Sequence, residues 1–88
     1  MRYHVFFSGS VQGVGFRYTT QDLANARGLT GWVKNTADGR VEMEVQGSKN
    51  EIDKLLNELK NSFAENIRAI DAQELSTEKE YNGFQIKF

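Results

Sequence analysis

The sequence predicts one α+β domain in which two helices cover one face of an antiparallel sheet. Three observations lead to this fold class. Apolar residues alternate in several short runs, as in half-buried strands; two longer runs have helical spacing; and the two kinds of run are interleaved along the chain. Because the chain has 88 residues and contains no repeat or long linker, we expect a single domain spanning residues 1–88.

The first strand and the first helix are expected on either side of a glycine-rich segment. The run Arg2–Ser8 alternates Tyr, Val and Phe with other residues and is rich in types that favour strands. After the glycines, apolar side chains return at helical spacing from Phe16 onward, and Gly28 stands where helices commonly end. We therefore expect a helix that begins near Gly15 or Phe16.

The middle of the chain predicts a β-hairpin. Leu29–Asn35 is its first strand, and Asp38–Gly39 is a strong signal for the turn. In the second strand Val41, Met43 and Val45 alternate with polar residues. One face of this strand is therefore expected in the core and the other in water.

The second helix is the clearest in the sequence. Ser48 and Glu51 have the spacing of a capping box, and an apolar stripe at helical spacing follows them. The stripe consists of Ile52, Leu55, Leu56, Leu59 and Phe63. We interpret it as core that covers the sheet, rather than as a groove for a partner.

Two more strands complete the prediction. The run Ile67–Leu75 has irregular apolar spacing, which indicates a bulge or a displaced boundary, and Phe84–Phe88 alternates as a short last strand. The order β-α-β-β-α-β with one added strand is that of the ferredoxin-like fold. In this topology the first two strands run parallel with the third between them. The segment ending in Arg17 and the strand end carrying Asn35 are therefore expected to be neighbours in space.

The glycine loop, Gly9–Gly15, is the first candidate functional feature. A glycine-rich loop that leads into a helix offers backbone N–H groups and the positive end of the helix dipole to an anion. Arg17 in the first turn opposes that dipole unless an anion binds beside it, and its guanidinium matches phosphate or carboxylate. The spacing alone also allows a simple glycine turn with a surface arginine.

Composition excludes several classes of function. The chain has no cysteine, no apolar run long enough to span a membrane and no signal peptide, so we expect a cytoplasmic protein without disulfides or membrane contact. A formal net charge of −1 argues against a general nucleic-acid binder. His4 is the only histidine and has no partner at ligand spacing, so no metal site is predicted.

Two blocks of the sequence resemble the acylphosphatase family. The segment "GSVQGVGFR", Gly9–Arg17, is similar to the family signature Gly-x-Val-Gln-Gly-Val-x-Phe-Arg, and "GLTGWVKNTADGRVE", from Gly28, is similar to its second block. The closing "FQIKF" also resembles the family's last strand, so the likeness covers essentially the whole chain. One departure is "NSFAENIR" after the second helix, where the family often has Gly-Pro. We expect this departure to lie far from the site.

The resemblance implies hydrolysis of the carboxyl–phosphate bond of acyl phosphates, without a metal ion or cofactor. Arg17 would bind the phosphate and Asn35 would position the attacking water. The phosphate-binding loop would comprise Gly9, Ser10, Val11, Gln12, Gly13, Val14 and Gly15. Inorganic phosphate is expected as product and inhibitor, and a monomer is expected as the solution state.

Two other classes of function remain to be weighed. An acylphosphatase-like binding module would hold a phosphate or carbamoyl-phosphate group without turnover, but this chain keeps both Arg17 and Asn35. An RNA-binding sheet of the same fold would need exposed aromatic residues on its central strands. The third strand offers Glu42 and Glu44 instead, so this alternative is disfavoured.

Overall fold

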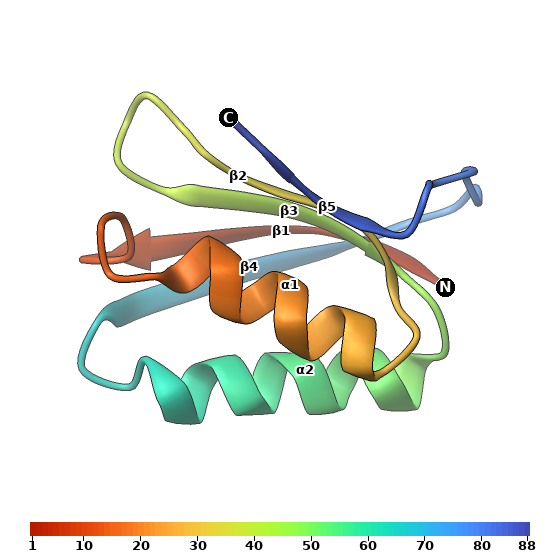
Figure 1. The fold of residues 1–88 in the computed structure, drawn as a ribbon, viewed down its shortest axis with the longest axis horizontal. Coiled ribbons are helices and arrows are strands. Elements are labelled where there is room, and N and C mark those ends of the chain that lie inside the picture. The colour runs from red at the N-terminus through yellow and green to blue at the C-terminus, as the bar shows by residue number, and fades with distance from the viewer.

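The computed structural model describes all 88 residues as two layers, a five-stranded sheet with both helices packed against one face (Figure 1). The ferredoxin-like order predicted from the sequence is confirmed. The elements are β1 (Arg2–Gly9), α1 (Phe16–Ala26), β2 (Thr30–Asn35), β3 (Val41–Gln46), α2 (Lys49–Ser62), β4 (Ile67–Leu75) and β5 (Phe84–Lys87). None of the helices is both long and apolar enough to cross a membrane.

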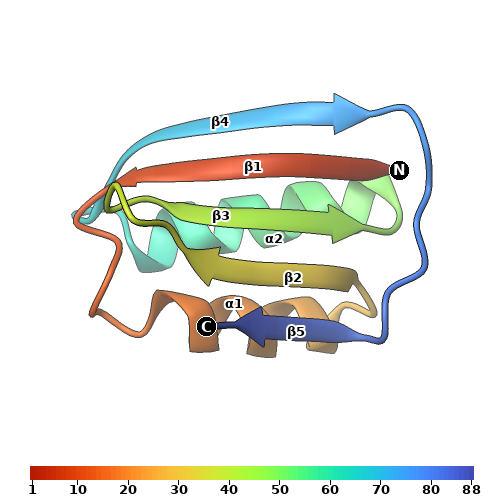
Figure 2. The same ribbon diagram turned by 90° about the horizontal axis from the view of Figure 1, so that it is seen from above.

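The strand order is β4-β1-β3-β2-β5, which Figure 2 shows from the open side of the sheet. β3 is antiparallel to both β1 and β2, so β1 and β2 run parallel with β3 between them, as predicted. The end of β1, the glycine loop and the β2–β3 hairpin consequently lie at the same end of the molecule (Figure 2).

The added strand makes the sheet mixed, which the sequence pattern did not indicate. β5 pairs in parallel with β2, from Gly31–Phe84 to Lys34–Lys87. The reason is topological: the connection from β4 to β5, residues 76–83, stays at one end of the sheet (Figure 2). β5 therefore runs opposite to β4 and in the same direction as β2.

The core lies between the sheet and the helices. The apolar stripe of α2 packs there as predicted, with Leu56 only partly buried, and Ser48 caps the helix by accepting a hydrogen bond from Glu51 N at 3.2 Å. The core contains Val5, Phe7, Val11, Phe16, Ala24, Leu29, Val33, Val41, Met43, Val45, Ile52, Leu55, Leu59, Phe63 and Phe84. Burial of this apolar surface is the main force that holds the two layers together.

A phenylalanine cluster fixes the start of α1 within this core. The Phe16 ring, 2% exposed, lies 4.9 Å from the Phe7 ring and 4.7 Å from the Phe63 ring between centroids. Phe7 belongs to β1 and Phe63 ends α2, so the first residue of α1 is packed against two other elements. The helix start that the glycine loop leads into is therefore held firmly in place.

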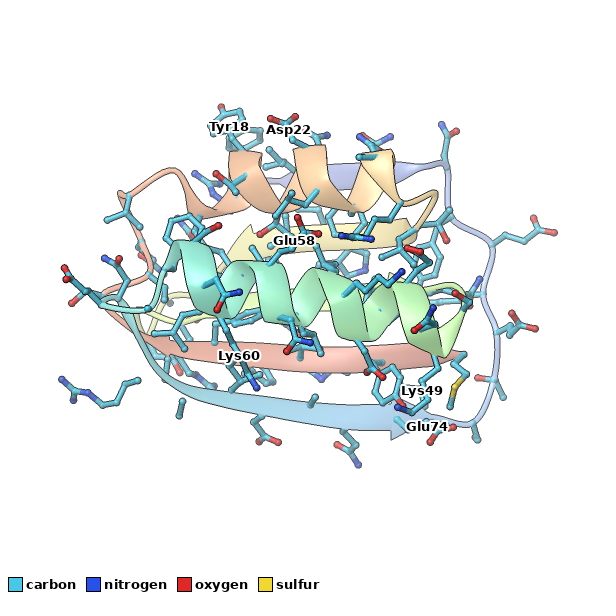
Figure 3. The ribbon with its side chains drawn as sticks, turned by 90° about the horizontal axis from the view of Figure 1, so that it is seen from below. Tyr18, Asp22, Lys49, Glu58, Lys60 and Glu74 are labelled. Atoms are coloured by element: carbon cyan, nitrogen blue, oxygen red, sulfur yellow. The ribbon has the colours of Figure 1, made fainter.

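The helices are also joined by charge. Arg27, after α1, donates to Glu51 at 3.0 Å and to Glu58 at 2.6 Å, and both glutamates belong to α2. Figure 3 views the molecule from the helix side, with Tyr18 and Asp22 on the side of α1 that faces away from α2. Exposed ion pairs of this kind contribute little each, so they orient the helices more than they stabilise them.

The irregular pattern expected in β4 is a register shift. Ser8 pairs with Ala69 but Gly9 pairs with Ile67, which leaves Arg68 as an extra residue on β4. This bulge lies where β1 gives way to the glycine loop. It brings the turn between α2 and β4 against the first residues of that loop.

Candidate active site

Three glycines give the glycine loop its shape. Gly9, Gly13 and Gly15 have φ angles of 123°, 75° and 81°, a region that other residues rarely occupy. Gly15 is the residue before α1 and offers no side chain to cap the helix. From Val11 to Tyr18, no backbone N–H donates a hydrogen bond to another group of the protein. The loop and first helical turn therefore present a run of free donors at the positive end of the α1 dipole.

Ser10 is the exception within the loop. Its N–H donates to the backbone oxygen of Asn66 at 2.9 Å, and the Asn66 Nδ2 donates back to the Ser10 oxygen at 3.0 Å. The Ser10 N–H is therefore already used within the protein. Asn66 belongs to the segment that departs from the family pattern, so the expectation that this segment lies far from the site was wrong. Asn66 lies there because β4 pairs with β1, so the turn before β4 meets the loop that follows β1.

Gln12 ties the loop to the β2–β3 hairpin. Its Nε2 donates to the backbone oxygens of Thr36 and Arg40, each at 2.8 Å. The side chain of Gln12 therefore faces the hairpin, and its backbone N–H is what it can offer to a ligand. Thr36 directly follows Asn35, so these bonds connect the two segments that the topology was expected to bring together.

The hairpin turn is an internally bonded unit. The Asp38 carboxylate accepts hydrogen bonds from the Thr36 hydroxyl and from the Arg40 Nε, the latter at 2.9 Å. The hydrogen bond from Thr36, followed by that from the Arg40 N–H, lowers the pKa of Asp38 below its usual value. Asp38 thus stabilises the turn, because its carboxylate is hydrogen-bonded to neighbouring residues of the turn itself.

Arg17 extends from α1 toward the end of β5. Its Nη1 lies 3.5 Å from the Lys87 oxygen, and its guanidinium lies over the Phe88 ring at 4.9 Å from the centroid. No carboxylate pairs with it, and it is only half-buried. Most of its N–H donors therefore remain available to an anion beside the glycine loop.

Asn35 is the last residue of β2 and is half-buried. Side chains alternate along a strand, so Asn35 lies on the same side as buried Val33, the side that the helices cover. β2 is paired with β5 up to Lys34 and Lys87, and the Lys87 oxygen is the group that Arg17 approaches. This pairing brings Arg17 and Asn35 to the same end of the sheet. Lys34 lies on the other side of the sheet, where its Nζ is 3.7 Å from Glu42.

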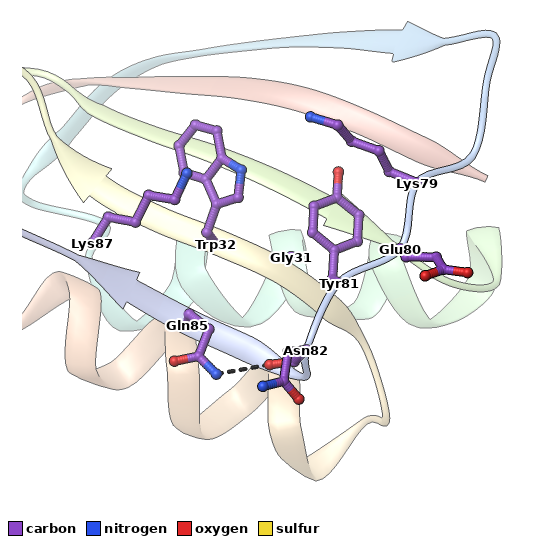
Figure 4. Close-up of a pocket in the computed structure, with 8 residues that line it drawn as sticks. All are labelled: Gly31, Trp32, Lys79, Glu80, Tyr81, Asn82, Gln85 and Lys87. Carbon is purple, nitrogen blue, oxygen red and sulfur yellow. Dashed lines mark hydrogen bonds between the residues drawn. The ribbon is translucent and has the colours of Figure 1, made fainter.

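The hollows on the surface lie elsewhere. One is on the open face of the sheet, between Trp32 and Tyr81, with Lys87 Nζ 4.3 Å from the centroid of the Trp32 ring (Figure 4). Another lies beside the start of β4. Neither includes the glycine loop. On the open face His4 pairs with Glu42 at 2.7 Å, and no three His, Asp or Glu side chains gather in a way that could hold a metal ion.

The fold and the loop together define a class of protein. It is a ferredoxin-like sandwich in which a glycine loop leads into α1 and lies beside the β2–β3 hairpin. A family model for acylphosphatases matches residues 3–86. An acylphosphatase of Paraburkholderia xenovorans (strain LB400) is 44% identical over 84 residues, which are 94% of this chain and 87% of the relative. The chain belongs to the acylphosphatase family, and the enzyme class expected from the sequence is confirmed.

Solved structures agree with this membership. The crystal structure of acylphosphatase from Bacillus subtilis superposes with a TM-score of 0.90 at 35% identity, covering 99% of this chain and 98% of that one. The crystal structure of T. kodakarensis HypF superposes with a TM-score of 0.84 at 30% identity, but this chain spans only 12% of it. The same fold thus occurs alone and as a small part of a larger protein.

Proposed function

We propose that this chain hydrolyses acyl phosphates without a metal ion, that the glycine loop and Arg17 bind the phosphoryl group, and that Asn35 positions the attacking water. The observation that carries the proposal is the run of free N–H groups from Val11 to Tyr18, which lies at the same end of the sheet as Arg17 and Asn35. Family membership supports the reaction, and this geometry supports the roles proposed for Arg17 and Asn35.

Phosphoryl transfer needs charge stabilisation and an in-line nucleophile more than it needs covalent chemistry. Several free N–H groups of one short loop, together with a guanidinium, would provide that stabilisation. A bound phosphoryl group also explains why a cation is placed at a helix start, where it otherwise opposes the dipole. The proposal therefore requires no metal ion to neutralise the phosphoryl oxygens.

The other half of the reaction is the water. Asn35 cannot act as a base near neutral pH, but its side-chain oxygen can accept a hydrogen bond from water and its NH2 can donate one. The leaving group is a carboxylate whose conjugate acid has a pKa of about 4, so it departs without a general acid. This accounts for a site that has no Asp, Glu or His among its proposed residues, and a substrate oxygen would take the proton from water.

The decisive experiment follows hydrolysis of acetyl phosphate or benzoyl phosphate in the presence of EDTA. We expect turnover by the wild-type chain, and its loss in both Arg17→Ala and Asn35→Ala. Lys54→Ala and Asn57→Ala are matched controls, because both residues are exposed on α2. Circular dichroism checks that each variant is folded. Turnover that vanishes with EDTA, or that survives in both site variants, would contradict the proposal.

A binding module without turnover is the second candidate, and the likeness to a small part of HypF favours keeping it. It predicts that inorganic phosphate binds at the glycine loop while acyl phosphates are not hydrolysed above background. In the enzyme we propose, phosphate competes with the acyl phosphate. The monomeric state and the cytoplasmic location expected from the sequence also remain proposals, which size-exclusion chromatography and cell fractionation would test.

A further inference from the structure

We propose that two amide side chains, Gln12 and Asn66, are positioning residues that hold the glycine loop in its binding shape and in register with Asn35. The inference rests on the function proposed above and adds how the site is kept assembled before substrate arrives. Each amide donates to backbone oxygens of a different segment, so the loop is held from two sides.

Asn66 acts on the first free N–H group of the loop. The Ser10 carbonyl and the Val11 N–H belong to the same planar peptide unit and point in opposite directions. The Asn66 Nδ2 donates to that carbonyl at 3.0 Å, and the backbone oxygen of Asn66 accepts from the Ser10 N–H at 2.9 Å. Fixing the carbonyl end fixes the direction of the Val11 N–H at the other end.

Asn66 is itself held firmly. Its N–H donates to the Phe63 oxygen at 2.9 Å, and the Phe63 ring packs against Phe16 in the core. Movement of this turn would disturb the end of α2 and the start of α1 together. The amide of Asn66 therefore connects the loop to a rigid part of the molecule.

Gln12 acts between the two halves of the site. Its NH2 group has two hydrogens, and each of the two oxygens of the hairpin takes one. The hairpin is closed at this point by the Thr36 N–H, which donates to the Arg40 oxygen at 2.9 Å. Since Thr36 follows Asn35, the bonds of Gln12 set the spacing between the loop and the residue proposed to position water.

The loop needs such support because of its composition. Glycine has the largest conformational freedom of any residue, and unpaired N–H dipoles that lie close together in one short loop repel one another when no anion is bound. The segment Val11–Gly15 donates no backbone hydrogen bond of its own. Without Gln12 and Asn66 the loop would have to be ordered by the substrate, which would weaken binding and misplace the reacting groups.

Substitutions of Asn66 and Gln12 should change different kinetic constants. In Asn66→Ala the glycine loop loses an oriented donor, the Val11 N–H. We therefore expect KM and the inhibition constant for inorganic phosphate to rise roughly 3- to 10-fold. In Gln12→Ala the glycine loop keeps its N–H donors but moves relative to Asn35. We expect kcat to fall roughly 10- to 100-fold, with the phosphate inhibition constant changed by less than about 3-fold.

Isosteric variants separate positioning from packing. Gln12→Glu and Asn66→Asp keep the shape but place an oxygen against a backbone oxygen, and each should be at least as impaired as the alanine variant. Gln73→Ala and Asn61→Ala are matched controls, since both residues are exposed and form no side-chain hydrogen bond. The controls should keep wild-type constants, and melting temperatures show which variants are folded at the assay temperature.

Wild-type kcat, KM and phosphate inhibition in folded Gln12 and Asn66 variants would overturn the inference. So would equal losses in kcat and in phosphate affinity that merely follow the loss of thermal stability. Failure of the proposed function is distinguishable, because it appears as no turnover by the wild-type chain or as no effect in the Arg17 and Asn35 variants. In that case phosphate titration by calorimetry still tests Asn66→Ala against the wild-type chain.

Discussion

The placement of Arg17 sets local helix stability against the phosphate-binding role that we propose for this residue. A cation in the first turn of a helix costs a few tenths of a kcal/mol, and no carboxylate in the protein offsets it. The residue is held instead by a carbonyl oxygen and an aromatic ring at the end of the chain, Lys87 and Phe88. Its geometry thus depends on a planar guanidinium as well as on charge.

Arg17→Lys should therefore be strongly impaired although the charge is kept. Lysine cannot provide the two-pronged hydrogen bonding proposed for phosphate, and it has no flat guanidinium to lie over the Phe88 ring. We expect kcat/KM for benzoyl phosphate to fall at least about 10-fold, which corresponds to about 1.4 kcal/mol. Steady-state kinetics on the wild type and the variant measure this. Phosphate inhibition by Arg17→Lys as strong as that of the wild type would argue against a bidentate role.

Two glycines of the loop should respond differently to alanine. At Gly13 a Cβ would meet no atom within 4 Å, so the cost is that of a left-handed residue, about 1–2 kcal/mol. At Gly9 a Cβ would also come within 2.2 Å of the Asn66 oxygen and 2.8 Å of the Arg68 nitrogen, both backbone atoms. We expect Gly9→Ala to destabilise the protein by several kcal/mol, clearly more than Gly13→Ala. Urea unfolding of the two variants checks the order, and equal midpoints would contradict it.

At the scale of elements, hydrogen bonds and an ion pair hold the connection from β4 to β5 against the end of the sheet. Arg2, 8% exposed, donates its Nε to the Thr77 oxygen at 2.6 Å. Tyr81 donates its hydroxyl to Glu44 at 2.7 Å, and Arg2 pairs with the same carboxylate at 3.2 Å. These contacts determine where β5 begins, and β5 carries the backbone oxygen that Arg17 approaches.

The carboxylate of Glu44 should make these contacts dependent on pH, and Glu44→Gln should remove that dependence. Burial favours the neutral carboxyl, but the hydrogen bond from Tyr81 and the charges of Lys79 and Arg2 outweigh it and hold the pKa of Glu44 below its usual value. A lowered folded-state pKa stabilises the fold above the unfolded pKa of about 4.3, and this stabilisation is lost as the pH falls through the folded value.

We therefore expect Glu44→Gln to be less stable than the wild type at pH 7, on the order of 1 kcal/mol, and the difference to shrink at pH 3. Urea midpoints at the two pH values measure it. Glu80→Gln is the control, because Glu80 lies exposed on the same connection. A difference between wild type and Glu44→Gln that is the same at both pH values would rule out the charge of Glu44 as the cause.

Elements with strong local signals could be predicted from the sequence, and so could the approach of the loop to Asn35. The cap at Ser48, the stripe of α2 and the alternation of β3 are local, and topology then brings the end of β1 beside the end of β2. The bonds of Gln12 and Asn66 could not be predicted. They join segments that are 24 and 56 residues apart, and their partners are backbone oxygens, which leave no mark in a sequence.

At the scale of the whole molecule, one small core supports both the fold and the site. Phe16 belongs to the core and is followed by Arg17. The glycine loop therefore cannot move away from its position without disturbing the packing of α1. We therefore expect residues 1–88 to unfold as a single cooperative unit. Trp32 is the only tryptophan, and its fluorescence should report the same urea midpoint as far-UV circular dichroism.

Because ligand binding and folding would then share one transition, inorganic phosphate should stabilise the entire chain. At 100 times its dissociation constant a ligand specific to the folded state adds about 2.7 kcal/mol. For a domain of this size that is a rise in melting temperature of roughly 10–20 °C. Arg17→Ala should lose most of the rise, whereas Lys54→Ala should keep it.

Phosphate also stabilises proteins generally, through exclusion from their surfaces, and this effect is common to all three chains. The difference between Arg17→Ala and the other two therefore isolates binding at the loop, and equal shifts in all three would place phosphate elsewhere.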